Sequence, residues 1–270
     1  MDSSSIKNEP EMNSFKISGI QKIAAVLVGF AILFSVYHFP EILQNHYQKP
    51  LILLFESCML LFTFVAFIIG KQKFKNGFRM YGLGGFRQHL GNLAKGLIIG
   101  IVISVLANLI PVWLGWSEMS VHLDWNQVLF QILLFAIGTL LPSLAEDILT
   151  RGYLKAFWPE RWNTNRLILL SAVVYVLNHI FRINKPDVML YLFILGLFLM
   201  WAFIATGSLW LTLGIHWGSN IAYQFFTNVV TTDSLKETGM ENYILAGCYA
   251  LGFGLVIVLY KKHFFNYKTD

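Results

Sequence analysis

The chain has 270 residues, of which 56% are hydrophobic and only 13% are charged. Soluble domains carry about 25% charged residues, so the composition excludes an ordinary soluble protein and predicts a membrane domain. The formal charge of +5 does not indicate a nucleic-acid partner, because the basic residues lie in loops and tails, where the positive-inside rule places them. We expect a polar N-terminal tail over residues 1–19, one transmembrane domain over 20–263 and a cytoplasmic tail over 264–270.

Eight apolar runs have about the length that a membrane-spanning helix needs. A helix takes about 20 apolar residues to cross the hydrocarbon core, where it satisfies its own backbone groups. In chain order the runs are approximately 23–39, 51–70, 97–116, 127–153, 167–181, 188–205, 208–230 and 243–260. The fifth is short and contains the polar residues Asn178 and His179. The sequence therefore predicts an all-α, polytopic transmembrane bundle of about eight helices.

Loop charges predict how this bundle is oriented. Basic residues gather in the second and fourth loops and in the C-terminal tail: Lys71, Lys73, Lys75, Arg79, Arg87, Lys95, Lys155, Arg161, Arg166, Lys261, Lys262 and Lys268. Acidic residues prevail in the third and seventh loops: Glu118, Asp124, Asp233, Glu237 and Glu241. The short fifth loop, with Arg182 and Lys185 against Asp187, is the exception. Lys and Arg are retained in cytoplasmic loops, so we expect an integral protein of a bacterial cell membrane with both termini in the cytoplasm.

The fourth run contains three ionisable residues, Glu146, Asp147 and Arg151. One charge at the middle of a membrane helix costs about 2.5–3.5 kcal/mol on insertion scales, so such residues usually have a function. Asp147 and Arg151 are four residues apart and can pair on one helical face, which leaves Glu146 as the carboxylate without a partner. The alternative is that this segment is the cytoplasmic end of a helix, where Arg151 and Lys155 reach the headgroups.

The seventh run contains His216 and Asn220, which are four residues apart and share a helical face. Gly214 and Gly218 flank His216 and allow a second helix to approach closely. The alternative is a pair of polar residues that only holds two helices together. His179, near the end of the fifth run, would by itself be more typical of a hydrogen-bonded structural residue than of a ligand.

These polar groups lie on three different predicted helices, and almost no other ionisable group lies deep in the chain. Lipid offers them no hydrogen-bond partner, so buried polar groups seek one another. We therefore expect Glu146, His179, His216 and Asn220 to converge on one cavity inside the bundle. Glu56 is left out of this set, because it lies near the start of the second run, at the level of the outer headgroups.

Three motifs occur in order on separate apolar runs: Glu-Asp-x-x-x-Arg at 146–151, Tyr-x-x-x-His at 175–179 and His-x-x-x-Asn at 216–220. This pattern resembles that of the CPBP family of intramembrane proteases. The family includes the CAAX prenyl endopeptidases and the Abi-like bacterial proteins linked to bacteriocin processing and self-immunity. Its usual motifs are Glu-Glu-x-x-x-Arg, Phe-x-x-x-His and His-x-x-x-Asn or Asp. Asp147 and Tyr175 depart from this pattern, whereas Glu146 matches the family's catalytic glutamate.

The resemblance implies the CAAX-endopeptidase fold and hydrolysis of a peptide bond within the lipid bilayer. It implies a peptide or a membrane protein as substrate, and no nucleic acid. In such chemistry a base activates water and hydrogen-bond donors hold the oxyanion. The residues that would carry it are Glu146 as the base, His179 to help hold the water, His216 and Asn220 as donors to the oxyanion, and Asp147 and Arg151 as supporting residues.

A second mechanism uses the same residues with a metal. Glu146, His179 and His216 would form a His₂Glu set that binds zinc and leaves the fourth position to water. The sequence has no HExxH motif, so we favour the interpretation without a cofactor. The main rival function is a non-catalytic bacteriocin-immunity or membrane binding protein on the same scaffold. A transporter with a proton relay is a further rival, but the two halves show no pair of interrupted helices in corresponding positions.

Overall fold

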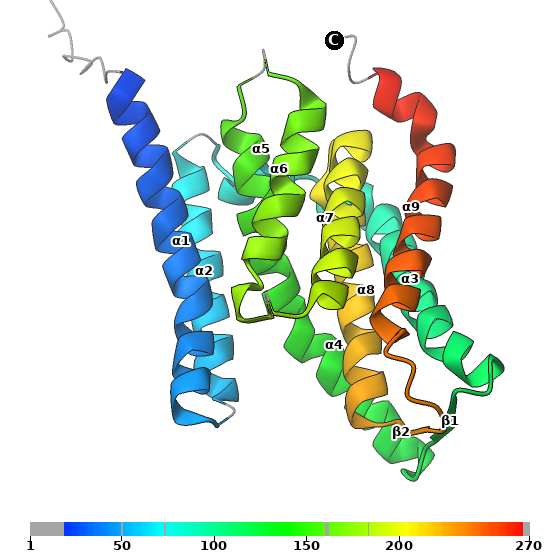
Figure 1. Cartoon of the computed structure of the whole chain (residues 1–270). Helices are drawn as coiled ribbons and strands as arrows, with labels where there is room; N and C mark the ends of the chain where they lie inside the picture. Colours follow the sequence, from blue (N-terminus) through cyan, green and yellow to red (C-terminus); the bar gives the residue numbers. More distant parts are fainter. Residues whose placement is uncertain (1–18, 50, 73, 160–161, 183, 267–270) are drawn as a thin grey trace, which may run out of the picture.

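The computed structural model describes residues 19–49, 51–72, 74–159, 162–182 and 184–266. Within these ranges the chain forms a bundle of long helices (Figure 1), which confirms the prediction of an all-α fold with about eight helices. The long helices are α1 (Gly19–Tyr47), α2 (Ile52–Lys71), α3 (Phe86–Trp113), α4 (Trp125–Asp147), α6 (Thr164–Leu177), α7 (Pro186–Thr206), α8 (Leu209–Asn228) and α9 (Glu241–Asn266). The short elements are η1 (Gly77–Tyr81), β1 (Ser117–Ser120), η2 (Ile148–Gly152), α5 (Tyr153–Phe157), η3 (Ile180–Arg182) and β2 (Thr231–Ser234). The predicted N-terminal tail lies almost wholly outside the described residues.

The two ends of the bundle carry different elements. α1 begins and α9 ends at one end, which we call the terminal face; it also holds η1 and α5 (top of Figure 1). The opposite end, which we call the far face, holds β1 and β2. These strands pair antiparallel, with Ser117 opposite Ser234. The sequence did not predict this small sheet, because its strands are only four residues long and lie in the loops between helices.

The helices that can cross a membrane are fewer than the eight predicted spans. Among the described residues, six segments are long and apolar enough: α1, α2, α3, the continuous run from α4 to α5, α7 and α9. α6 begins and ends earlier than predicted, and its 14 residues extend only ~21 Å, which is less than the ~30 Å of the hydrocarbon core. α8 has 20 residues, but polar residues such as His216 lower its hydropathy, and most of its side chains are buried inside the bundle.

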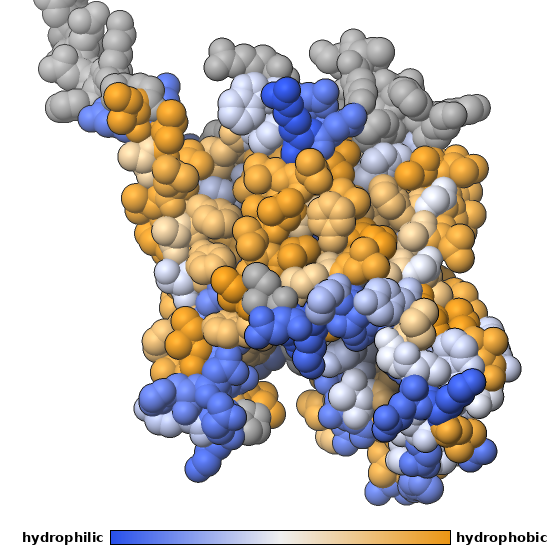
Figure 2. Space-filling view, viewed as in Figure 1, coloured by the Kyte–Doolittle hydropathy of each residue, from blue (hydrophilic) through white to orange (hydrophobic). Residues whose placement is uncertain are grey.

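The outer surface of the bundle is suited to lipid. Figure 2 shows a band of hydrophobic residues across the middle of the molecule, with hydrophilic residues toward both ends. Within this outer surface Ile137, Leu251 and Val258 are 74%, 77% and 73% exposed. Apolar surface of this extent would be costly in water. The protein is therefore an integral membrane protein.

α3 and α8 pack closely through glycines on both helices. A Cβ atom on Gly96 or Gly100 of α3 would collide with the backbone of α8, and one on Gly214 or Gly218 of α8 would collide with the backbone of α3. This contact confirms the predicted role of the two glycines beside His216. α8 is thereby held against α3 on one side, and its polar residues meet α4 on another.

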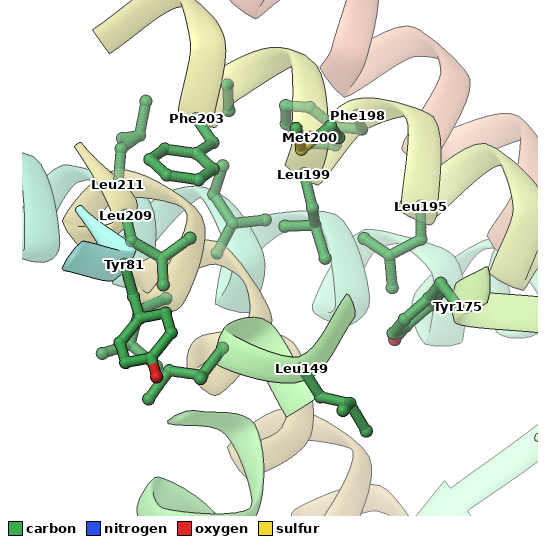
Figure 3. Close-up of a cluster of buried hydrophobic side chains, with 14 of the residues drawn as sticks. Tyr81, Leu149, Tyr175, Leu195, Phe198, Leu199, Met200, Phe203, Leu209 and Leu211 are labelled. Carbon is green, nitrogen blue, oxygen red and sulfur yellow. The ribbon is translucent and has the colours of Figure 1, made fainter. Parts of the chain in front are cut away.

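The hydrophobic core extends to the terminal face. Figure 3 shows Tyr81, Phe203 and Leu209 close together in this cluster. They come from η1, the end of α7 and the start of α8, and their exposed fractions are 0%, 2% and 0%. Packed side chains therefore fill the bundle where these elements meet.

Candidate active site

The predicted polar residues meet in a cavity of about 710 Å³ inside the bundle. Glu146 of α4, His179 just after α6, and His216 and Asn220 of α8 all line it. The structure therefore brings together the four residues that were expected to converge. Ligand sites in proteins commonly have volumes of about 300–1,000 Å³, so the cavity has room for a short stretch of peptide.

Glu146 lies at the centre of these contacts. The residue is buried, with 5% of its surface exposed. Its Oε1 accepts a hydrogen bond from Asn178 Nδ2 at 2.7 Å and lies 3.7 Å from His179 Nε2. Its Oε2 lies 3.3 Å from His216 Nε2. The sequence analysis left this carboxylate without a partner, whereas the structure gives it three polar neighbours.

Asp147 connects Arg151 to His216. Arg151 Nη1 donates to Asp147 Oδ1 at 2.5 Å, and both side chains are fully buried. The predicted pair is thus confirmed, and the alternative in which Arg151 reaches the headgroups is wrong. The same Asp147 oxygen lies 3.1 Å from His216 Nδ1, a contact that the sequence did not predict. A carboxylate that accepts from Nδ1 holds the ring in one orientation, and here it directs Nε2 at Glu146.

The chain leaves regular α-helical geometry directly after Glu146 and Asp147. Residues Ile148–Gly152 form a π-helical turn, η2, and such turns often occur at functional sites. Thr150 Oγ1 donates to the carbonyl oxygen of Glu146 at 2.7 Å, and Ser171 Oγ of α6 donates to the carbonyl oxygen of Thr150 at 2.8 Å. These bonds give two buried carbonyl oxygens of the turn a side-chain donor.

Tyr175 packs its ring against the charged and aromatic residues of the cluster. The ring centroid lies 4.4 Å from the guanidinium carbon of Arg151, 5.0 Å from the ring of His179 and 5.9 Å from the ring of His216. The backbone oxygen of Tyr175 also accepts from His179 Nδ1 at 2.9 Å, which turns Nε2 of that ring toward Glu146. These contacts use the aromatic ring, which explains why tyrosine can stand where the family has phenylalanine.

The side chain of Asn220 hydrogen-bonds to a residue of α4 other than Glu146. Its Nδ2 donates to Ser143 Oγ at 2.9 Å, and Ser143 Oγ in turn donates to the carbonyl oxygen of Thr139 at 2.6 Å. The side chain of Asn220 therefore lies in the cavity wall, one helical turn from His216 on the same face of α8.

The sequence analysis missed the residues that support Glu146 from the other side. Asn178 is only 4% exposed, and because its amide nitrogen donates to Glu146, its Oδ1 is left to accept from His38 Nε2 at 2.9 Å. His38 of α1 is 3% exposed, and its Nδ1 lies 3.0 Å from Glu41 Oε2. His38 could have been found by the signal that identified Glu146, since it is an ionisable residue inside an apolar run.

Glu56, in the first turns of α2, lines the same cavity. The sequence left it out of the set because of its position near the end of a predicted span, which does not prevent it from lining the cavity. A Cβ atom on Gly138 of α4 would lie 4.0 Å from Glu56 Oε1, so this carboxylate faces the gap between α2 and α4. The cavity thus contains a second carboxylate besides Glu146.

The structure does not support the zinc set formed by Glu146, His179 and His216. Within the described part of the chain, no group of three or more His, Cys, Asp or Glu residues is arranged to hold a metal ion. His216 Nδ1 faces Asp147, and its Nε2 faces Glu146, which is itself a member of the set.

The fold and the buried carboxylate–histidine cluster define a polytopic membrane protein with a polar cluster inside its bundle. Residues 125–222 match the family model described as "Type II CAAX prenyl endopeptidase Rce1-like". This match confirms the resemblance to the CPBP and CAAX proteases, covers all three motifs and supports a membrane endopeptidase in general. No curated protein and no solved structure matches the chain.

Proposed function

We propose that this protein is an intramembrane endopeptidase in which Glu146 activates a water molecule without a metal. The observation that carries the proposal is the position of the Glu146 carboxylate, buried beside two histidines and an amide in a cavity large enough for peptide. A buried charge in a membrane bundle is costly unless it has a function. Both termini lie in the cytoplasm in this proposal, because the loops near them are basic.

In the proposed reaction Glu146 acts first as a base and later as an acid, and the polar groups around it hold the water and the oxyanion. Glu146 takes a proton from water while the water oxygen bonds to the carbonyl carbon of the scissile peptide. The oxyanion that forms accepts hydrogen bonds from His216 Nε2 and Asn220 Nδ2. The C–N bond then breaks, and Glu146 returns the proton to the leaving nitrogen. His179 holds the water beside Glu146 through Nε2.

The short distance between Glu146 and His216 suits this sequence of events. In the resting site His216 Nε2 faces the ionised carboxylate at 3.3 Å. His216 carries hydrogen on both ring nitrogens in this mechanism, because Nδ1–H donates to Asp147 and Nε2–H faces Glu146. Once Glu146 has taken the proton, the carboxylate charge is gone and the His216 Nε2–H is released. This N–H can then donate to the oxyanion as the oxyanion forms. Asp147 keeps the ring aimed at this point throughout.

Cleavage by purified protein tests the proposal. The wild-type chain and Glu146→Gln are incubated with a library of peptides in detergent or vesicles, and products are identified by mass spectrometry. Glu146→Gln keeps the side-chain volume and loses the base, so we expect a folded protein without turnover. Glu237→Gln makes the same exchange in the exposed loop after β2 and retains the turnover. Equal turnover by Glu146→Gln and wild type would rule out the base role and favour a non-catalytic binding or immunity protein.

A further inference from the structure

The cavity opens toward the far face of the bundle. Its lining includes Gln44 in the last turns of α1, Asn108 near the end of α3, and Gln224 and Asn228 at the end of α8. All four side chains are polar, and all lie toward the far-face ends of their helices. Figure 2 shows the molecule hollowed on this side, with hydrophilic residues around the hollow.

The opening arises because α6 and α7 do not extend to the far face. Figure 1 shows the connection between these two helices ending well short of the far ends of α4 and α8. α6 has only 14 residues, and η3 turns the chain back immediately after His179. Arg182 of η3 lines the cavity. The space that a full-length α6 would fill is therefore an entrance that leads up to His179 and Glu146.

The route from the terminal face is closed by packed side chains. Arg151, Tyr81 and Tyr153 are 0%, 0% and 2% exposed. Tyr81 Oη donates to the carbonyl oxygen of Ala66 at 2.8 Å, and Tyr153 Oη donates to that of Val26 at 2.7 Å. Glu146 is only ~16 Å along the helix from the end of α5 at this face, so the packing, rather than the distance, blocks the approach.

The charges at the two faces differ in sign. Basic residues prevail near the terminal face: Lys71, Lys75, Arg79, Arg87, Lys95, Lys155 and Arg166. Acidic residues outnumber basic ones near the far face, where Lys49 and Lys236 lie among Glu41, Glu118, Asp124, Asp233, Glu237 and Glu241. The positive-inside rule places the basic end in the cytoplasm, which puts the cavity mouth on the outer side of the membrane.

We propose that the active site is entered from the outer, non-cytoplasmic side, and that its substrate is a polypeptide segment presented there. The substrate is an exported peptide or the outer part of a membrane protein, and not the carboxyl terminus of a cytosolic protein. The part of this inference that concerns a substrate rests on the proposed protease function. The direction of access, however, is a property of the fold that can be measured without any cleavage.

Cysteine labelling in intact cells tests the direction of access. Cys58 and Cys248 are first replaced by alanine in the full-length chain expressed in bacteria. Gln224→Cys then places a thiol in the cavity wall, Asn228→Cys places one at its mouth, and Lys75→Cys places one at the terminal face. Each variant is treated with a membrane-impermeant maleimide before and after the cells are permeabilised.

We expect Gln224→Cys and Asn228→Cys to be labelled in intact cells, and Lys75→Cys to be labelled only after permeabilisation. The reverse pattern would overturn the inference and leave the protease proposal standing with a cytoplasmic substrate. Labelling of Asn228→Cys without Gln224→Cys, under either condition, would show that the cavity is closed to solutes and would also overturn it. Loss of turnover in Glu146→Gln is scored separately, so the two proposals can fail independently.

Discussion

Asn178→Leu should lower turnover while leaving the helical fold intact. Leucine has nearly the shape of asparagine, but it cannot donate to Glu146 Oε1, which Asn178 Nδ2 contacts at 2.7 Å. A hydrogen bond to a charged group contributes about 1.5–3 kcal/mol. If this bond orients the base in the transition state, its loss reduces kcat by roughly 10- to 150-fold at 1.36 kcal/mol per factor of ten. The side chain is buried, so water cannot replace the lost donor.

The assay compares kcat of wild type, Asn178→Leu and His38→Ala on one cleaved peptide, with the melting temperature in detergent as the check on folding. His38→Ala removes the contacts to Asn178 and Glu41 but leaves the Asn178 donor to Glu146 in place, so its effect on kcat should be smaller, and the double variant should resemble Asn178→Leu. Asn184→Leu, in the exposed connection after η3, is the matched control. A folded Asn178→Leu protein with kcat within about twofold of wild type, a change below roughly 0.5 kcal/mol, would refute the role of this amide.

Four further outcomes follow from the contacts. Tyr175→Phe should keep its activity, because the ring provides the contacts to Arg151 and both histidines. Tyr175→Leu should lose activity, and equal activities of the Phe and Leu variants would contradict the role of the ring. Asp147→Asn should lower stability by about 3–5 kcal/mol, because it breaks a buried pair. It should also lower turnover, because His216 is no longer oriented; a loss of stability alone would mean that the contact to His216 does not contribute to turnover. Gly100→Ala should lower the melting temperature, since its Cβ would collide with α8, whereas Gly91→Ala on the same helix meets open space and should not. Chelators should leave the rate unchanged, and one tightly held zinc per chain, released by His216→Ala, would contradict the proposed metal-free mechanism.

The sequence predicted the helices and the motif residues because both follow from local patterns. Apolar runs of sufficient length identify helices that face lipid, and spacings of four residues identify side chains on one helical face. Such spacings correctly paired Asp147 with Arg151 and placed His216 beside the glycines that face α3. None of these inferences required knowledge of which helices are neighbours.

The features that the sequence could not predict depend on tertiary contacts. The fifth span was extended to residue 181 because Ile180 and Phe181 are apolar, yet both lie in η3 after the end of α6 and are 49% and 53% exposed. Hydropathy does not distinguish an apolar residue in a helix from one in the turn that follows it. Asn178 lies next to the motif histidine, and no periodicity indicates that the amide, rather than the imidazole, makes the closer contact with Glu146.

The matched segment alone does not complete the site, because α1 contributes to it from outside. Hydrogen bonds hold α1 against that segment at two levels: Tyr153 Oη donates to the carbonyl oxygen of Val26 toward the terminal face, and His38 bonds to Asn178 deeper in the bundle. Lipid cannot replace either partner, so moving α1 away would leave His38 and Asn178 unsatisfied. The Asn178 amide would then be free to rotate, and Glu146 would lose its fixed donor. The position of α1 and the orientation of the proposed base are therefore coupled, and a chain that lacks α1 should keep the motifs while losing the geometry that makes them active.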